Sequence, residues 1–363
     1  MKKALFSLIL LFLLSPAFAQ QITQLTSPDG KIQIEINPEN GLTYSISHQG
    51  KLLIQPSRLG FSLNKPEVKL SEFDLLGSEE KSVDQTWTPV YGERSDIRDQ
   101  YQELRLRLKA KSQPAVEIQV VFRAYNDGVG FRYEFPEQEG FKHFVVEEEL
   151  TEFRLGVDHL AFWIPGDYDT NEFLYNTTRL SEVKALEANA KEIDIAVKSP
   201  IGDNFVQTPL QLVTESGFYI HIHEAALVNY PVMQLELDKS DFTLKSHLVP
   251  DAVGNKAYLQ TATSTPWRSI IISKTPEGIL ASDLILNLND PAQEEDYSWV
   301  TPQKFIGVWW EMHVGKSTWE YTTSQGGLNA DNIKHAKPTG RHGATTARVK
   351  QYIDFAAKHG FGG

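Results

Sequence analysis

The 363-residue sequence contains no cysteine, so two kinds of stabilising or metal-binding site that depend on cysteine are absent from it. Disulfide bonds and thiolate metal sites are both excluded, so any metal would have to be held by oxygen or imidazole ligands. A chain of this length buries most of its surface on folding and does not depend on cross-links. We therefore expect a fold that is stabilised by core packing alone.

The sequence also lacks an excess of positive charge and, beyond its N-terminus, any long apolar run. Its formal net charge is −12, which argues against nucleic acid or an anionic membrane surface as a partner. A neutral substrate such as a sugar fits this charge better, although acidity also serves solubility. No later segment is apolar enough to span a membrane.

The first 19 residues have the three parts of a secretory signal peptide. Lys2 and Lys3 supply positive charge, Leu5–Leu14 is apolar, and Ala17-Phe18-Ala19 has the small residues of a cleavage site. We predict that residues 1–19 are removed and that the mature chain begins at Gln20 or the next residue. The mature protein is then expected to be periplasmic or secreted.

Residues 20–290 repeat a pattern of strand, turn and strand. Lys31–Ile36 and Glu103–Leu108 alternate apolar and polar side chains with a period of two. Asn126-Asp127-Gly128 is typical of a hairpin turn with positive φ. Further strand-like runs are Leu42–Ile46, Val116–Val120, Gly130–Phe135, Gly217–His223, Gln234–Leu237 and Ser269–Ile272. Many short strands without a long amphipathic helix predict a mainly β protein in which sheets pack on sheets.

The remaining residues have a different pattern. Residues 291–303 are polar and turn-rich and are predicted to be a linker. Lys304–Trp310 is interpreted as a buried strand, and Thr346–His359 is interpreted as a helix capped by Thr345 or Thr346 and ended by Gly360.

One strand and one helix cannot cover each other's apolar faces, because a parallel α/β layer needs neighbouring strands. We therefore interpret residues 304–363 as the truncated start of an α/β domain. The side chains of Phe305, Trp309 and Trp310 are then expected to form an exposed apolar patch on a loosely docked segment.

The run His221-Ile222-His223-Glu224 is the first candidate for chemistry. It is not the two-histidine zinc helix, because position 227 is Leu and the run is predicted to be a strand. On a strand, His221 and His223 share one face and Glu224 points to the other. A metal-binding histidine pair, an oxygen ligand at Glu224 and an ordinary solvated face all remain open at this point.

Two further segments place carboxylates or arginine beside aromatic rings. Trp163–Asp169 and Pro266-Trp267-Arg268 both suit sugar binding, because rings pack on pyranose faces while charged groups bond hydroxyls. A loop with buried aromatics explains these residues equally well. Trp309–His313 follows the predicted strand, at the position where α/β barrels carry their chemistry.

Four motifs in order resemble glycoside hydrolase family 97, a family of exported α-glucosidases and α-galactosidases. They are Ala124–Tyr133, Ile222–Leu227, Gly307–His313, and His342–Thr346 with Tyr352–Ala357. The resemblance covers the mature chain. It implies a large β-super-sandwich of the galactose mutarotase-like kind, followed by a (β/α)₈ barrel of which residues 304–363 would be the first β/α unit.

The resemblance also implies a Ca²⁺ ion in the active site, with Glu224 as the ligand from the sandwich, since Ca²⁺ prefers carboxylate oxygens. Trp310, His313 and Arg268 are the expected substrate contacts. The substrate would be an α-linked oligosaccharide cleaved by an exo-acting monomer.

Glycoside hydrolysis needs two positioned carboxyl groups, and in this family they lie on later barrel strands that the chain lacks. No catalytic residue is therefore expected here, and we expect the 363 residues to be inactive and to bind Ca²⁺ weakly or not at all. Two alternatives are a non-catalytic carbohydrate-binding sandwich and an aldose epimerase, which would need a His and a Glu in one pocket.

Overall fold

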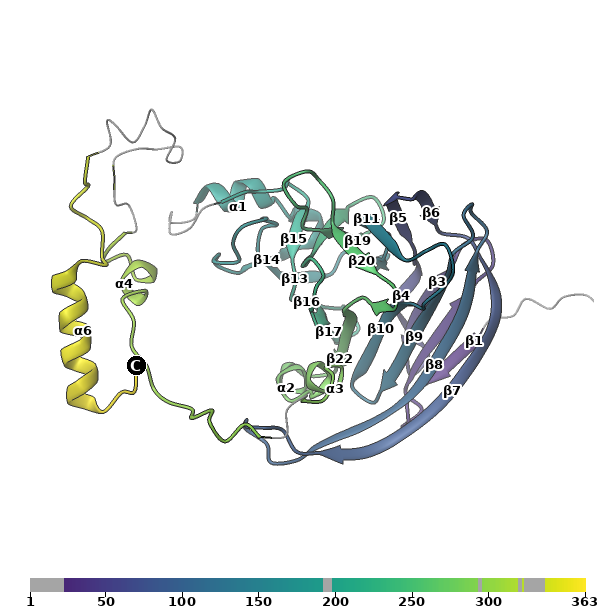
Figure 1. Cartoon of the computed structure of the whole chain (residues 1–363), viewed down its shortest axis with the longest axis horizontal. Coiled ribbons are helices and arrows are strands. Elements are labelled where there is room, and N and C mark those ends of the chain that lie inside the picture. The colour runs from purple at the N-terminus through teal and green to yellow at the C-terminus, as the bar shows by residue number, and fades with distance from the viewer. Residues whose placement is uncertain (1–22, 192–197, 293–295, 319–321, 323–336) are drawn as a thin grey trace, which may run out of the picture.

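The computed structural model describes residues 23–191, 198–292, 296–318, 322 and 337–363. The predicted signal peptide, residues 1–19, lies outside the described residues, as do residues 293–295 of the predicted linker. Antiparallel sheets are the main regular structure of the described chain, and its helices are few and mostly short (Figure 1). None of the helices in the described part is both long and apolar enough to cross a membrane.

Three antiparallel sheets make up the sandwich. The first contains, in spatial order, β1 (Thr23–Thr26), β2 (Ile32–Asn37), β3 (Thr43–His48), β4 (Lys51–Arg58), β12 (Glu152–Arg154), β19 (Thr243–Leu248), β18 (Met233–Asp238) and β15 (Phe205–Gln207). The second contains β14 (Asn176–Arg179), β13 (Leu160–Trp163), β16 (Leu210–Val213), β17 (Tyr219–Ala225), β22 (Trp267–Ser273), β10 (Gly128–Phe135), β9 (Glu117–Tyr125), β8 (Ile97–Ala110) and β7 (Phe73–Trp87), with β21 (Thr263–Ser264) paired to β10. The third contains β20 (Ala257–Gln260), β11 (His143–Glu149), β5 (Phe61–Lys65) and β6 (Glu67–Leu70).

The main core lies between these sheets and follows the period of two seen in the sequence. In β2, Ile32, Ile34 and Ile36 are all buried while the residues between them are more exposed. Aromatic rings fill the centre, with Phe61 against Tyr133 at 4.6 Å between ring centroids. The predicted β-sandwich and all eight predicted strands within it are confirmed.

The hairpin predicted at Asn126-Asp127-Gly128 joins β9 to β10, with Tyr125 paired to Gly128. The positive φ expected there was wrong, because none of the three turn residues adopts it. Glycine is required at 128 for another reason: a Cβ at this position would lie 2.4 Å from the carbonyl oxygen of Ile270 on β22. Close strand approach, and not turn geometry, explains this glycine.

Short helices α2 (Pro276–Leu280) and α3 (Leu284–Asn287) cover part of the outer face of the ten-stranded sheet (Figure 1). There they help to enclose a second, smaller core, in which Leu284 and Leu288 pack with Tyr125, Trp267 and Ile271. The remaining short helices of the sandwich are η1 (Leu180–Glu182) and α1 (Ala185–Lys191).

The predicted buried strand at Lys304–Trp310 was wrong. No strand forms there, and Trp310 instead begins the short helix α4 (Trp310–His313). A strand needs a neighbour to bond its N–H and C=O groups. The Ile306 N–H donates to Gly363 O at 3.1 Å and the Gly362 N–H donates to Lys304 O at 2.9 Å, and these two bonds to the last residues do not make a ladder.

The predicted helix is confirmed as α6 (Thr346–His359). Thr345 Oγ1 accepts a hydrogen bond from the Arg348 N–H at 3.3 Å, and Gly360 ends the helix with φ 68°. Figure 1 shows α4 and α6, at the yellow-green end of the chain, set apart from the sandwich. As expected, Phe305 and Trp310 are exposed, by 78% and 72%.

Candidate functional site

Glu224 and Arg268 lie opposite each other on β17 and β22, and both side chains point into the sandwich. Arg268 Nη1 donates to Glu224 Oε2 at 2.5 Å. Arg268 Nε and Nη2 donate to the two oxygens of Glu149 on β11, at 2.9 and 2.6 Å. One guanidinium is therefore enclosed by two carboxylates, and the Glu149 contact has the bidentate geometry that arginine favours.

Further hydrogen bonds hold this buried cluster in place. Tyr230 donates its hydroxyl proton to Glu149 Oε2 at 2.9 Å, and Thr151 Oγ1 donates to Glu149 Oε1 at 2.7 Å. The Met233 N–H donates to Glu224 Oε1 at 3.2 Å. Each carboxylate oxygen thus has a partner, which is the condition for keeping charge inside a core.

The buried setting changes the acid strength of both partners. Burial raises the pKa of Glu224, and the positive charge of Arg268 opposes this rise only in part. Burial also disfavours the charged form of Arg268, but the neighbouring Glu149 outweighs it and the pKa of Arg268 is raised. Arg268 therefore stays charged and fixes the positions of the two carboxylates.

Arg268 does not have the access that the predicted substrate contact requires. Its side chain has no exposed surface, and its donors face Glu149 and Glu224. A sugar cannot reach a guanidinium in this position. We interpret Arg268 as the charge that stabilises two buried carboxylates, which corrects the prediction made from its position beside Trp267.

The residues and hydrogen bonds around Glu224 show whether this carboxylate could serve as a calcium ligand. Ca²⁺ takes six to eight oxygen ligands, and in the described part of the chain no three acidic or histidine side chains converge. Both Glu224 oxygens already accept a hydrogen bond, although a carboxylate has about four acceptor positions. Glu224 therefore fits as one ligand of a site that other residues would have to complete.

The histidine pair lies on the opposite face of β17, as the strand pattern predicted. The His221 and His223 rings are 6.2 Å apart between centroids, and His221 Nδ1 is 3.2 Å from Gln211 Oε1. Burial lowers the pKa of His221 to about 4 and lowers that of His223 as well. The two neutral rings face away from Glu224, which argues against an epimerase site that combines a His with a Glu.

The loop from Trp163 to Asp169 is built around one buried carboxylate. Asp167 accepts hydrogen bonds from the backbone N–H groups of Asp169, Thr170 and Ser199, at 2.9, 3.1 and 2.8 Å. Trp163 is buried and donates through its indole nitrogen to Thr178 Oγ1 at 3.0 Å. These two side chains fold the loop, which agrees with the interpretation as buried aromatics and leaves no exposed Trp163 ring for a sugar.

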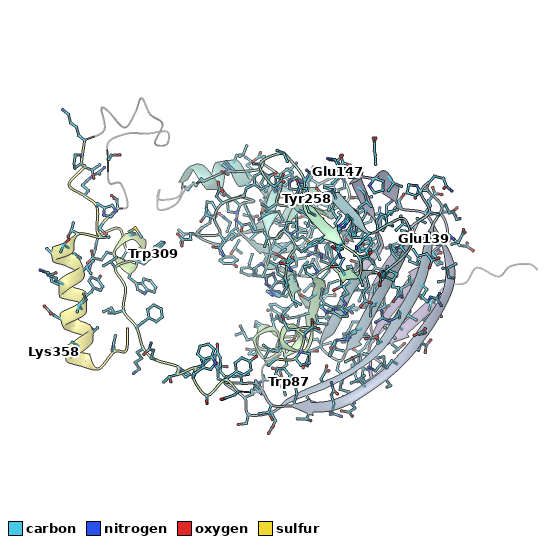
Figure 2. The ribbon with its side chains drawn as sticks, viewed as in Figure 1. Trp87, Glu139, Glu147, Tyr258, Trp309 and Lys358 are labelled. Carbon is cyan, nitrogen blue, oxygen red and sulfur yellow. The ribbon has the colours of Figure 1, made fainter. Side chains whose placement is uncertain are left out.

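Trp310 and His313 lie in helix α4 and not at the end of a strand. The side chain of His313 lies outside what the structure describes. Figure 2 labels Trp309, directly before α4, and shows it well away from the sandwich strands that carry Glu224 and Arg268. Of the predicted substrate contacts, Arg268 lies against the predicted metal ligand Glu224, whereas Trp310 does not.

Sequence reasoning missed Glu149 and Tyr230 as partners of this cluster. Side chains alternate between the two faces along a strand, so a count from the buried Val146 predicts that the side chain of Glu149 points out of the core. The pairing of β11 with β5 shifts register between Val146 and Glu148, and this irregularity turns Glu149 inward. No periodic signal in the sequence could have shown that shift.

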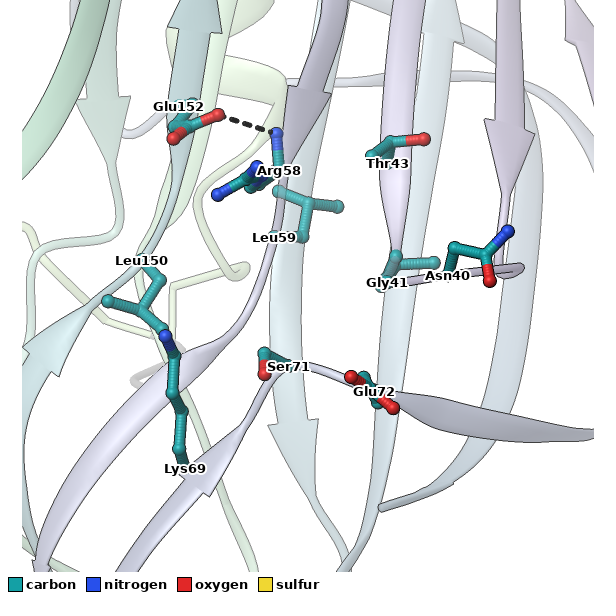
Figure 3. Close-up of a pocket in the computed structure, with 11 residues that line it drawn as sticks. Asn40, Gly41, Thr43, Arg58, Leu59, Lys69, Ser71, Glu72, Leu150 and Glu152 are labelled. Atoms are coloured by element: carbon teal, nitrogen blue, oxygen red, sulfur yellow. Dashed lines mark hydrogen bonds between the residues drawn. The ribbon is translucent and has the colours of Figure 1, made fainter. Parts of the chain in front are cut away.

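One cavity of about 290 Å³ lies at the end of the eight-stranded sheet (Figure 3). Glu152 accepts a hydrogen bond there from the Arg58 N–H at 3.2 Å, drawn as the dashed line in Figure 3. Its other walls are largely the turns around Gly41 and Ser71. The cavity is at the lower limit of ligand pockets and has no aromatic wall, so we assign it no function.

The architecture defines a large β-super-sandwich domain with a buried acidic cluster. Residues 25–291 match the family model described as Glycosyl-hydrolase 97 N-terminal. This match covers most of the chain, which therefore belongs to glycoside hydrolase family 97.

Two curated relatives and two solved structures illustrate the similarity. A retaining alpha-galactosidase of Bacteroides thetaiotaomicron is 26% identical over 99% of this chain and 52% of its own length. A probable retaining alpha-galactosidase of Streptomyces bingchenggensis is 24% identical over 97% of this chain and 47% of its own length. This chain thus spans about half the length of the curated relatives it matches.

Among solved structures, a family 97 enzyme from Pseudoalteromonas sp. strain K8, in complex with acarbose, superposes with a TM-score of 0.74. It is 35% identical and the alignment covers 93% of this chain and 46% of that one. A beta-arabinopyranosidase superposes with a TM-score of 0.64 at 19% identity, covering 94% and 50% of the two chains, and shows the shared fold alone.

Proposed function

We propose that this sandwich is part of an exo-acting α-glycosidase that removes terminal α-glucosyl or α-galactosyl units from oligosaccharides. The observation that carries the proposal is the family match over residues 25–291, supported by relatives named alpha-galactosidases. The predicted signal peptide supports a periplasmic or secreted enzyme, and we further propose that it is a monomer.

We propose that Glu224 contributes one oxygen ligand to a catalytic Ca²⁺ ion. Glu224 lies at the end of β17, and each of its two carboxylate oxygens accepts one hydrogen bond and has room for a further contact. Both features support this role. When bound, Ca²⁺ would supply positive charge that stabilises negative charge near the reacting sugar. Arg268 and the Met233 N–H would hold the Glu224 carboxylate in a fixed orientation, so that the ligand is positioned before the ion arrives.

The 363-residue chain on its own is proposed to be inactive. Glycoside hydrolysis needs a general acid and a second carboxylate on either side of the scissile bond. Glu149 and Glu224 are brought together, but Arg268 lies between them and the cluster is buried. The purified chain should release no nitrophenol from 4-nitrophenyl α-glucoside or α-galactoside above a buffer control. Release at a rate that scales with protein concentration would overturn this proposal.

The activity of the longer protein is tested separately. The coding DNA downstream of codon 363 should encode further barrel strands with carboxylates at their ends, and the extended protein should cleave one of the two nitrophenyl substrates. Chelation of Ca²⁺ should remove the activity, and Glu224→Gln should raise the Ca²⁺ concentration needed to restore it. An extended protein that cleaves neither substrate in the presence of Ca²⁺ would contradict the assignment.

A further inference from the structure

We propose that the outer face of the ten-stranded sheet carries a second sugar-binding site, distinct from the Glu224 cluster. The site is a cavity of about 600 Å³ between this sheet, the end of β7 and the chain around α3, which we call the outer-face cavity. This volume lies within the range of ligand pockets. The choice of a sugar as ligand rests on the proposed function, and the cavity itself indicates a neutral pyranose unit.

The floor of the outer-face cavity is a stack of flat groups. The Arg123 and Arg132 guanidinium groups lie 4.6 and 4.5 Å from the ring centroid of Trp267, and Arg123 also lies 4.4 Å from that of Tyr101. Such stacking holds the guanidinium planes in fixed orientations. The floor is therefore rigid, and its N–H donors have fixed positions before a ligand binds.

Each of these arginines is balanced by a carboxylate from the sheet. Arg123 Nε donates to Glu103 Oε2 at 2.8 Å, and Arg132 donates through Nε and Nη2 to Glu134 Oε1 at 3.0 and 2.7 Å. A guanidinium has five N–H donors, more than these bonds use. Arg105 also contacts Glu103 and Glu134, so that with Asp99 three arginines face three carboxylates. The floor thus offers donors without a large net charge, which favours the hydroxyls of a neutral ligand over an anion.

The rim supplies an aromatic ring and a hydrogen-bond acceptor. The Trp87 indole N–H donates to Asn287 Oδ1 at 2.8 Å, and Asn287 Nδ2 donates to Arg98 O at 3.0 Å, so the ring is fixed between the β7–β8 hairpin and α3. Buried Asp99 accepts from Gln85 Nε2 at 3.0 Å and from the Tyr125 hydroxyl at 3.1 Å, and a carboxylate has about four acceptor positions, so further positions remain. A ring beside a carboxylate matches the apolar face and the hydroxyls of a pyranose.

The outer-face cavity and the Glu224 cluster can be tested independently. Trp267 and Arg268 are consecutive on β22, and consecutive strand residues point to opposite faces of a sheet. Figure 2 shows Trp87 at the edge of the sheet, beside α3 and the start of the segment that leads to the C-terminus. A substitution in the cavity therefore leaves the Arg268 contacts unchanged.

The test is isothermal titration of the 363-residue chain with maltotriose and with raffinose, which carry α-glucosyl and α-galactosyl units. We expect one of the two to bind, and Trp87→Ala to weaken its affinity by about tenfold, which corresponds to about 1.4 kcal/mol. Trp87→Phe, which keeps a ring, should weaken it by about threefold or less. The matched control Trp299→Ala removes an exposed tryptophan outside the cavity and should leave the affinity unchanged.

A second variant covers the case in which Trp87→Ala does not fold. Val90→Trp adds bulk at a half-exposed rim position and should abolish binding without altering the core. Binding of neither sugar by the native chain, or native affinity in both Trp87→Ala and Val90→Trp, would overturn the proposal. Glu224→Gln should bind the sugar with native affinity, so failure of the α-glycosidase assignment and failure of this site are distinguishable.

Discussion

The tryptophans of the sandwich and those of residues 304–363 have opposite environments. Trp163 lies on a paired strand and is 2% exposed, whereas Trp310 lies in a four-residue helix and is 72% exposed. Both segments are rich in apolar residues, but only the first has neighbouring strands on both sides. An apolar segment is stabilised when it is buried, and in this molecule the presence of neighbouring strands decides whether the segment is buried.

The largest expected effect comes from replacing one tryptophan in each of the two regions and comparing the costs. Trp163→Ala should lower the free energy of unfolding by about 3–5 kcal/mol, because it leaves a cavity in the core. Trp310→Ala should change it by less than about 0.5 kcal/mol, as expected for a surface position. Urea denaturation followed by circular dichroism measures both. Equal costs for the two variants would show that the C-terminal segment is packed as well as the sandwich.

The second prediction compares two arginines that each contact a carboxylate. Arg268→Met should destabilise the protein by about 3–5 kcal/mol, because it leaves Glu149 and Glu224 buried without their counter-charge. Arg348→Met, which breaks the half-exposed contact of Arg348 with Glu311 at 3.4 Å, should cost about 1 kcal/mol or less. If Arg268→Met unfolds at the same urea concentration as the native chain, the structural role given to Arg268 is wrong.

The third prediction compares two glycines with ordinary φ. Gly128→Ala should cost about 1–3 kcal/mol, because its Cβ would meet the Ile270 carbonyl oxygen and force β10 away from β22. Gly307→Ala, with nothing within 4 Å of its added Cβ, should be neutral or slightly stabilising. Thermal melts of the two variants test this, and a native melting temperature for Gly128→Ala would contradict the close approach.

The smallest effect concerns one partly buried carboxyl group, Glu148. Burial raises its pKa to about 7, although Lys256 at 3.5 Å and the Leu248 N–H at 3.0 Å favour the charged form. The neighbouring His247, 3.6 Å away, has its pKa lowered by burial to about 4, so this contact is not an ion pair at neutral pH.

The folded state therefore keeps a proton on Glu148 that the unfolded state releases above its ordinary pKa near 4.5. This contribution to stability is complete below pH 4.5 and is lost as the pH rises through 7. Glu148→Gln has no such loss, so its stability relative to the native chain should increase by about 1–2 kcal/mol between pH 5 and pH 8. Denaturation at four pH values measures the difference, and a constant difference would exclude the raised pKa.

The sequence was sufficient for features that depend on local pattern. The period of two located β2, β8 and β17, and the caps Thr345 and Gly360 located α6, because these signals act within a few residues. Features that depend on distant partners were missed or wrong. The apolar run at Lys304–Trp310 could not show that it lacked a neighbouring strand, and the register shift that turns Glu149 inward depends on β5.

For the same reason, the residue types at the site were found but their relations were not. Glu224 and the two histidines were correctly placed on opposite faces of one strand. The partnership of Glu224 with Arg268 depends on pairing between β17 and β22, which are separated by more than 40 residues in the chain. Only the folded sheet shows that Arg268 faces carboxylates and not a ligand.

Hydrogen–deuterium exchange of the 363-residue chain, read by mass spectrometry, tests the contrast between the two regions most directly. We predict slow exchange in β9, β10 and β22, because their backbone groups are paired inside the ten-stranded sheet. Residues 304–318 and α6 should exchange much faster, since an isolated helix of this length is marginal in water. Protection of Lys304–Trp310 equal to that of β10 would contradict the account.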